Sequence, residues 1–117
     1  MKILVSDFIF DFHSRFKFLK YRILTETRGE DKFIEKDDVK ESLLFFSEIF
    51  HNIYEGSVYI WGVKEQEYLN QLVDMNVLHK LDDFYIPLFV FSDGGRPSET
   101  FLKYCDKNKI PVISFEQ

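Results

Sequence analysis

Short apolar runs separated by helical patterns dominate the second half of the chain. The strand-like runs span residues 57–63, 85–92 and 110–116, and the middle one is apolar on both alternating faces, as a covered central strand should be. Helical patterns fill the intervals at residues 64–80 and 97–108. Strands that alternate with helices across short joints predict three parallel strands.

The first third has a less uniform pattern. Residues 3–12 are rich in β-forming types, with phenylalanines at every second position from Phe8 to Phe12, and they predict a strand. Residues 13–27 fit both helical and strand spacing, and their bulky and branched side chains favour a strand. A tight turn and a short return strand then complete a predicted hairpin by residue 35.

The most regular helical periodicity lies between residues 38 and 54. Asp38 followed three positions later by Glu41 resembles a capping box. An apolar stripe then recurs at steps of three and four, and Gly56 supplies a stop. This segment predicts a helix that packs on the sheet.

Taken together, these patterns predict an α/β fold. The 117 residues are enough for one core but too few for two, so residues 1–117 form a single domain. We expect a three-layer sandwich with a mixed sheet of five or six strands. It would combine a C-terminal βαβαβ parallel unit with N-terminal antiparallel strands.

Composition and charge narrow the function classes. The net charge of −5 and the pI near 5.2 argue against a general nucleic-acid binder and permit a basic protein partner. Cys105 is the one cysteine, and no cysteine or histidine cluster has zinc spacing. The chain shows no signal peptide or membrane span. We therefore expect a cytoplasmic protein with no metal and no cofactor.

The loop after residues 85–92 is the first candidate binding site. Ligands of open α/β sheets bind beyond the carboxyl ends of the strands, where glycines allow close approach and a helix start favours anions. The alternative is an ordinary turn in which Pro97 opens a helix, since neither a dinucleotide fingerprint nor a P-loop is present. The candidate anion-binding residues are Asp93, Gly94, Gly95, Arg96 and Ser98.

Residues 88–116 resemble the closing βαβ unit of Rossmann-like nucleotide-sensing domains of the SLOG kind. Those domains also have a strand, a glycine-rich turn and a helix before a short apolar strand. The resemblance implies nucleotide binding, but the glycine loop near the first strand of such domains is Ser6-Asp7-Phe8 here.

The predicted hairpin is the second candidate site. A basic run from Arg15 to Arg22 is followed by a strongly acidic segment. These charges either pair across a solvated hairpin or form an acidic knob that meets a basic protein. The candidate partner-binding residues are the acids Glu26, Glu30, Asp31, Glu35, Asp37 and Asp38, with Tyr21 and Phe33 as aromatic anchors.

No catalytic group is predicted. Asp7 and Asp11 share one face of the predicted strand but would lie about 13 Å apart, too far to act together. His51 and His79 fall near predicted helix ends, where a cation suits the helix dipole. Cys105 fits a small buried hydrophobe better than a nucleophile.

Three functions remain open. The favoured one is an immunity-protein or antitoxin inhibitor that binds a basic toxin or enzyme and blocks its active site, because such a protein needs no catalytic motif. The second is a Rossmann-like domain or enzyme that binds a nucleotide or anion through Gly94, Gly95 and Arg96. The third is an accessory subunit in phage or host defence.

Overall fold

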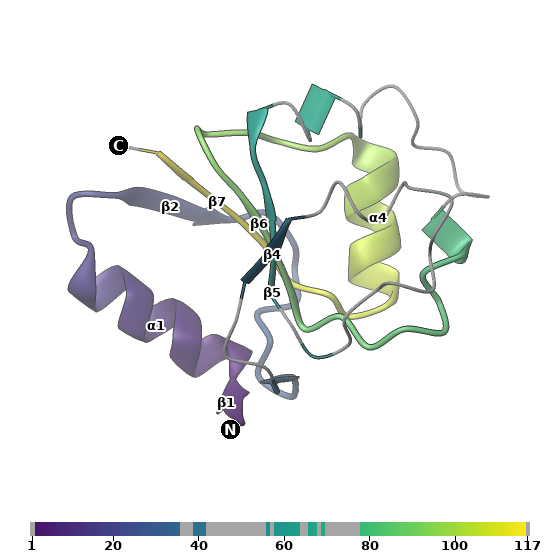
Figure 1. The fold of residues 1–117 in the computed structure, drawn as a ribbon, viewed down its shortest axis with the longest axis horizontal. Helices are drawn as coiled ribbons and strands as arrows, with labels where there is room; N and C mark the ends of the chain where they lie inside the picture. The colour runs from purple at the N-terminus through teal and green to yellow at the C-terminus, as the bar shows by residue number, and fades with distance from the viewer. Residues whose placement is uncertain are drawn as a thin grey trace.

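A mixed sheet with helices on opposite faces forms the centre of the molecule (Figure 1). This arrangement, seen in a computed structural model, confirms the predicted α/β class and the layered architecture. The structure describes residues 2–35, 39–41, 56, 58–63, 66–67, 69 and 78–116.

The sheet has five strands in the order β2-β7-β6-β5-β4. Four strands run parallel to one another: β4 (Val39–Glu41), β5 (Val58–Trp61), β6 (Leu88–Phe91) and β7 (Val112–Glu116). Strand β2 (Lys20–Ile23) pairs with β7 in the antiparallel direction. The three parallel C-terminal strands and the antiparallel N-terminal strand are thus confirmed.

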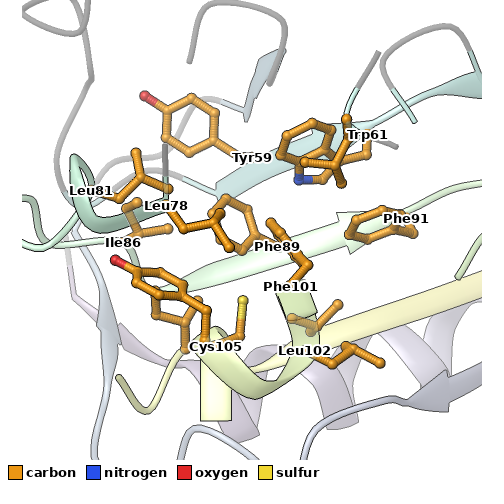
Figure 2. Packing of buried hydrophobic residues seen from close by; sticks show 14 residues of the cluster. Tyr59, Trp61, Leu78, Leu81, Ile86, Phe89, Phe91, Phe101, Leu102 and Cys105 are labelled. Carbon is orange, nitrogen blue, oxygen red and sulfur yellow. The ribbon is translucent and has the colours of Figure 1, made fainter. Parts of the chain in front are cut away.

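One face of the sheet is an aromatic layer that packs on helix α4, Glu99–Lys107 (Figure 2). Phe101 of α4 is fully buried against three rings of the sheet. Its ring centroid lies 5.8 Å from that of Trp61, 5.4 Å from Phe89 and 5.8 Å from Phe91. Tilted and edge-to-face geometries of this kind stabilise aromatic pairs beyond the area that they bury.

The opposite face is aliphatic and packs on helix α1, Val5–Arg15. Val5 and Ile9 are the buried residues of α1. They belong to one cluster with Val58, Leu88, Val90 and Ile113 of the sheet and Ile34 of β3. Because successive strand residues point to opposite faces, each strand contributes to both layers.

The strand predicted over residues 3–12 is wrong, because only β1 (Ile3–Leu4) is extended and α1 follows at once. Val5, Ile9 and the ring of Phe12 lie at spacings that also place them on one side of a helix. Burial of that side against the sheet outweighs the β-propensity of the phenylalanines, which depends strongly on context.

The predicted hairpin is also wrong, although both of its strands exist in shortened form. Strand β3 (Phe33–Ile34) pairs with β1 in a separate two-stranded sheet, whereas β2 pairs with β7. The backbone amides of Glu26 and Thr27 donate to Oδ1 of Asp106, at 2.8 and 3.3 Å. The connecting segment is therefore held by α4 rather than by a hairpin partner.

The helix predicted over residues 38–54 begins incorrectly, since Val39–Glu41 is strand β4 and pairs with β5. The remainder, residues 42–54, lies outside the described residues. Of the helix predicted over residues 64–80, the described positions 66, 67, 69, 78 and 79 are helical. None of the helices within the described ranges is long and apolar enough to cross a membrane.

The helix predicted over residues 97–108 is confirmed by α4. Ser98 is its N-cap, and the Ser98 hydroxyl accepts a hydrogen bond from the Phe101 amide at 3.3 Å. The polar cap and the buried ring at the first turn together fix where α4 begins.

The central role of Phe101 can be tested by truncation. Phe101→Ala should lower the free energy of unfolding by about 3–5 kcal/mol, because it leaves a cavity among three rings. Phe10→Ala is the matched control, since the Phe10 side chain is 73% exposed and its loss should change stability by less than about 0.5 kcal/mol. Urea denaturation of both variants measures the difference, and equal losses would contradict this account of the core.

Candidate functional site

The carboxyl edge of the sheet brings together segments that are distant in sequence. Strand β6 ends at Phe91 and leads into the loop of residues 92–98. Strand β7 ends beside it at Glu116, and antiparallel β2 starts there because Lys20 lies opposite Glu116. The predicted anion loop therefore has the N-terminal residues of β2 as neighbours.

The amides of the two loop glycines are used within the fold. The Gly94 amide donates to the Phe115 carbonyl at 2.9 Å, and the Gly95 amide donates to the Ser92 carbonyl at 3.0 Å. These two amides are therefore already bonded within the fold. Any anion at this loop would be bound mainly by side chains.

Side chains approach both glycines closely at the same place. Gly94 has a φ of +67°, and a Cβ there would lie 2.7 Å from Oε2 of Glu116. A Cβ at Gly95 would overlap the side-chain amide of Gln66. That amide nitrogen donates to the carbonyls of Trp61 and Ser92, at 2.9 and 3.0 Å, and so connects the ends of β5 and β6.

A cavity of about 140 Å³ lies beneath the glycine loop, against β2 and β7. It is lined by three cationic side chains from two parts of the sequence, one carboxylate and one buried hydroxyl. These residues are Lys20, Arg22, Arg96, Glu116 and Ser114. The arrangement is suited to an anionic group of about the size of a phosphate.

The guanidinium of Arg96, which lines this cavity, has only a weak partner within the fold. Its Nη2 lies 3.4 Å from Oε1 of Glu99, and both side chains are exposed. Exposed ion pairs of this kind contribute little free energy, so a bound anion would compete easily with Glu99 for the guanidinium.

Of the five predicted anion-binding residues, Gly94, Gly95 and Arg96 line the cavity. Ser98 does not line it and serves as the α4 N-cap. The Asp93 carboxylate accepts a hydrogen bond from the Ser92 hydroxyl at 3.0 Å and also lies outside this cavity. Sequence reasoning missed Lys20 and Arg22, and the basic run that contains them was the available signal.

The acids of the predicted knob lie at the surface wherever the structure describes them. Glu26, Glu30, Asp31 and Glu35 are exposed, as is Phe33, while Asp37 and Asp38 lie outside the described residues. Tyr21 is half-buried on the opposite, α1-facing side of the sheet, with its ring centroid 4.6 Å from that of His13. Tyr21 lines one hollow together with Arg28 and Glu30, and a binding role for this set stays a prediction.

A polar network connects α4 to residues 79–82. The Tyr104 hydroxyl donates to Oδ1 of Asp82 at 2.7 Å, and Nδ1 of His79 lies 3.0 Å from Oδ2. These hydrogen bonds lower the pKa of Asp82, while burial and Asp82 itself raise the pKa of Tyr104 well above its usual value. Tyr104 is fully buried on α4, so we assign this network the structural role of fixing α4 against residues 79–82.

Asp7 and Asp11 lie one helical turn apart on α1. The separation argued from a strand was therefore wrong. Asp11 pairs with Nε of Arg15 at 3.0 Å. Across the described part of the chain, no group of three or more acidic, histidine or cysteine side chains is arranged to hold a metal ion.

Comparison with known proteins gives a family match over almost the whole sequence. The model of the family described as HPr serine kinase N terminus matches residues 3–117. No curated protein matches the chain. This family differs from the nucleotide-sensing domains of the SLOG kind, which residues 88–116 resemble.

A solved structure shares the fold. It contains the CBS and DRTGG domains of the regulatory region of a Clostridium perfringens pyrophosphatase, complexed with the activator diadenosine tetraphosphate. The TM-score is 0.57 at 20% sequence identity, and the alignment covers 95% of the present chain. The chain spans 40% of the length of that protein chain.

These comparisons overturn the interpretation of the chain as an immunity protein or antitoxin. The matched family is the N-terminal part of a serine kinase, and nothing in either match indicates a toxin inhibitor. The interpretation depended on an acidic net charge and on the lack of catalytic motifs. Both properties are just as compatible with a regulatory domain. The basic toxin or enzyme expected as partner loses its support as well.

The structural role assigned to Cys105 can be tested directly. It is fully buried, and burial raises the pKa of its thiol well above the usual value. We expect the native protein to react with a thiol-specific reagent such as dithionitrobenzoate far more slowly than the urea-unfolded chain. Fast reaction of the native protein would contradict a purely structural role for Cys105.

Proposed function

This chain belongs to the HPr serine kinase N-terminus family, and from that premise we propose that it is a regulatory domain that binds a phosphate-bearing small molecule. The ligand site is the cavity beneath the loop of Gly94, Gly95 and Arg96. One observation carries the proposal: Lys20, Arg22 and Arg96 line the same small cavity.

The local charge at this cavity differs in sign from that of the whole chain. Three cations and one carboxylate line it, although the protein has a net charge of −5. Like charges placed around one cavity repel each other, and a phosphate of about −1.5 to −2 charge would offset that repulsion. The buried Ser114 hydroxyl could add a neutral hydrogen bond.

The structural neighbour supports a nucleotide as the ligand class. Its regulatory region was crystallised with diadenosine tetraphosphate, an activator that carries a chain of phosphates. A ligand of this class would present to the cavity the group that its cations favour.

We place the protein in the cytoplasm. It has a single cysteine, which is buried and cannot form an internal disulfide. A reduced, buried thiol fits a compartment in which disulfides are rare.

Calorimetric titration with ATP and with tripolyphosphate tests the site. Arg96→Ala should weaken both ligands about tenfold, because a hydrogen bond to a charged group contributes about 1.5 kcal/mol or more. Lys107→Ala is the matched control, since it removes one exposed cation at the opposite end of α4, and it should leave both affinities unchanged. Equal affinities in wild type and Arg96→Ala would contradict the proposal, as would the absence of binding by either ligand.

The carboxylate in the cavity gives a second prediction of opposite sign. Glu116→Gln keeps the shape of the side chain but removes its repulsion of a bound anion, so tripolyphosphate should bind several-fold more tightly. The gain should shrink at high salt, because screening weakens the interaction between exposed charges. The same titration at two salt concentrations measures it, and weaker binding by Glu116→Gln would argue against an anion at this place.

A further inference from the structure

The outer edge of β2 presents backbone groups that no strand of the described sheet pairs with. β2 is the last strand on one side of the five-stranded sheet and lies beside α1 (Figure 1). The Leu24 amide donates to the Val112 carbonyl of β7 at 2.8 Å. Because hydrogen bonding alternates along an antiparallel pair, the backbone of Arg22 also faces β7, whereas the backbone groups of Tyr21 and Ile23 face away from it. An extended peptide can bind to such an edge through its main chain.

A hollow of about 200 Å³ lies between this edge and α1. Tyr21 and Ile23 of β2 line it together with Phe10 of α1, whose side chain is 73% exposed. Arg28 and Glu30 also line it, and their opposite charges offset each other. The volume is below the range usual for sites that take a whole small molecule. The hollow is therefore suited to an apolar side chain of a peptide that lies along β2.

The opposite face of β2 is cationic. Successive strand residues point to opposite faces, so Lys20 and Arg22 stand on the α4-facing side, away from the hollow. Neither cation makes an ion pair with another residue in the part of the chain that the structure describes. Lys20 lies opposite Glu116 of β7, whereas Arg22 lies opposite the neutral Ser114. Arg22 is therefore the cation with the least compensation from its neighbouring strand.

We propose that the β2 edge binds an extended segment of a partner protein in which acidic and apolar residues alternate. The segment adds to the sheet as a further strand. Its apolar side chains enter the hollow beside Phe10, and its acidic side chains lie next to Lys20 and Arg22, because opposite charges on neighbouring strands attract each other. Charges on an edge strand disfavour strands that lack the opposite charge. A second copy of β2 would bring like cations together and is disfavoured for the same reason.

A labelled, capped peptide in which glutamate and valine alternate tests this edge by fluorescence anisotropy in phosphate-free buffer. Wild-type protein should bind it about tenfold or more tightly than a peptide with the same residues in two blocks, because only alternation places the acids on one face of a strand. The alternating peptide with every backbone amide methylated should not bind, because methylation removes the main-chain donors that pair with the edge.

Two variants test the two faces separately. Phe10→Ala should weaken the glutamate–valine peptide about tenfold, whereas Val63→Ala, which shortens an exposed apolar side chain beyond the end of β5, should not. Arg22→Glu should weaken it about tenfold or more and should allow binding of an alternating lysine–valine peptide. Lys107→Glu makes the same charge change in the last turn of α4 and should do neither.

The outcomes decide the inference independently of the proposed function. Equal binding of the alternating and block peptides overturns it, as does the absence of binding or an unchanged affinity in Arg22→Glu. A wild-type dimer by light scattering that Phe10→Ala or Arg22→Glu separates also overturns it, because the edge would then bind a second copy. Circular dichroism confirms that each variant is folded. None of these measurements includes a phosphate-bearing ligand, so their failure leaves the phosphate site standing.

Discussion

The packing of Phe101 on three rings of the sheet is the contact on which the rest of the structure depends. Phe101 lies in the first turn of α4 and also donates its amide to the Ser98 cap, so one residue fixes both the depth and the start of the helix. The loop between β6 and α4 then has little freedom. Arg96 is consequently delivered to the carboxyl edge by a hydrophobic contact that lies well below the surface.

The C-terminal half could be predicted from the sequence because strands that follow one another in the chain also pair with one another in the sheet. Strands β5, β6 and β7 are neighbours in the sheet as well as in the chain, so alternation of strand and helical patterns determined their direction. The N-terminal third differs because its partners are remote. Strand β2 pairs with β7 about ninety residues later, and no local pattern shows that choice. The alternating phenylalanines from Phe8 to Phe12 have the spacing of a strand. The segment is nevertheless a helix, because this places Val5 and Ile9 against the aliphatic face of the sheet.

The candidate site stays a prediction, and the structure changes the reasons for proposing it. The glycines pointed to the loop, but their amides are bonded within the fold and their small size accommodates Gln66 and Glu116. The cations that change the character of the site, Lys20 and Arg22, come from β2. The whole-chain charge suggested an acidic inhibitor, because an average over all residues conceals a small region of opposite sign.

Strand β2 is also the last strand on its side of the described sheet. An edge strand exposes unpaired backbone groups to which another molecule can add, and charged side chains on that strand discourage such addition. Lys20 and Arg22 line the cavity, and their charges also disfavour the addition to β2 of another strand that lacks acidic residues. If an anion neutralised these two side chains, it would remove part of that protection, and such a strand could then add to this edge more easily.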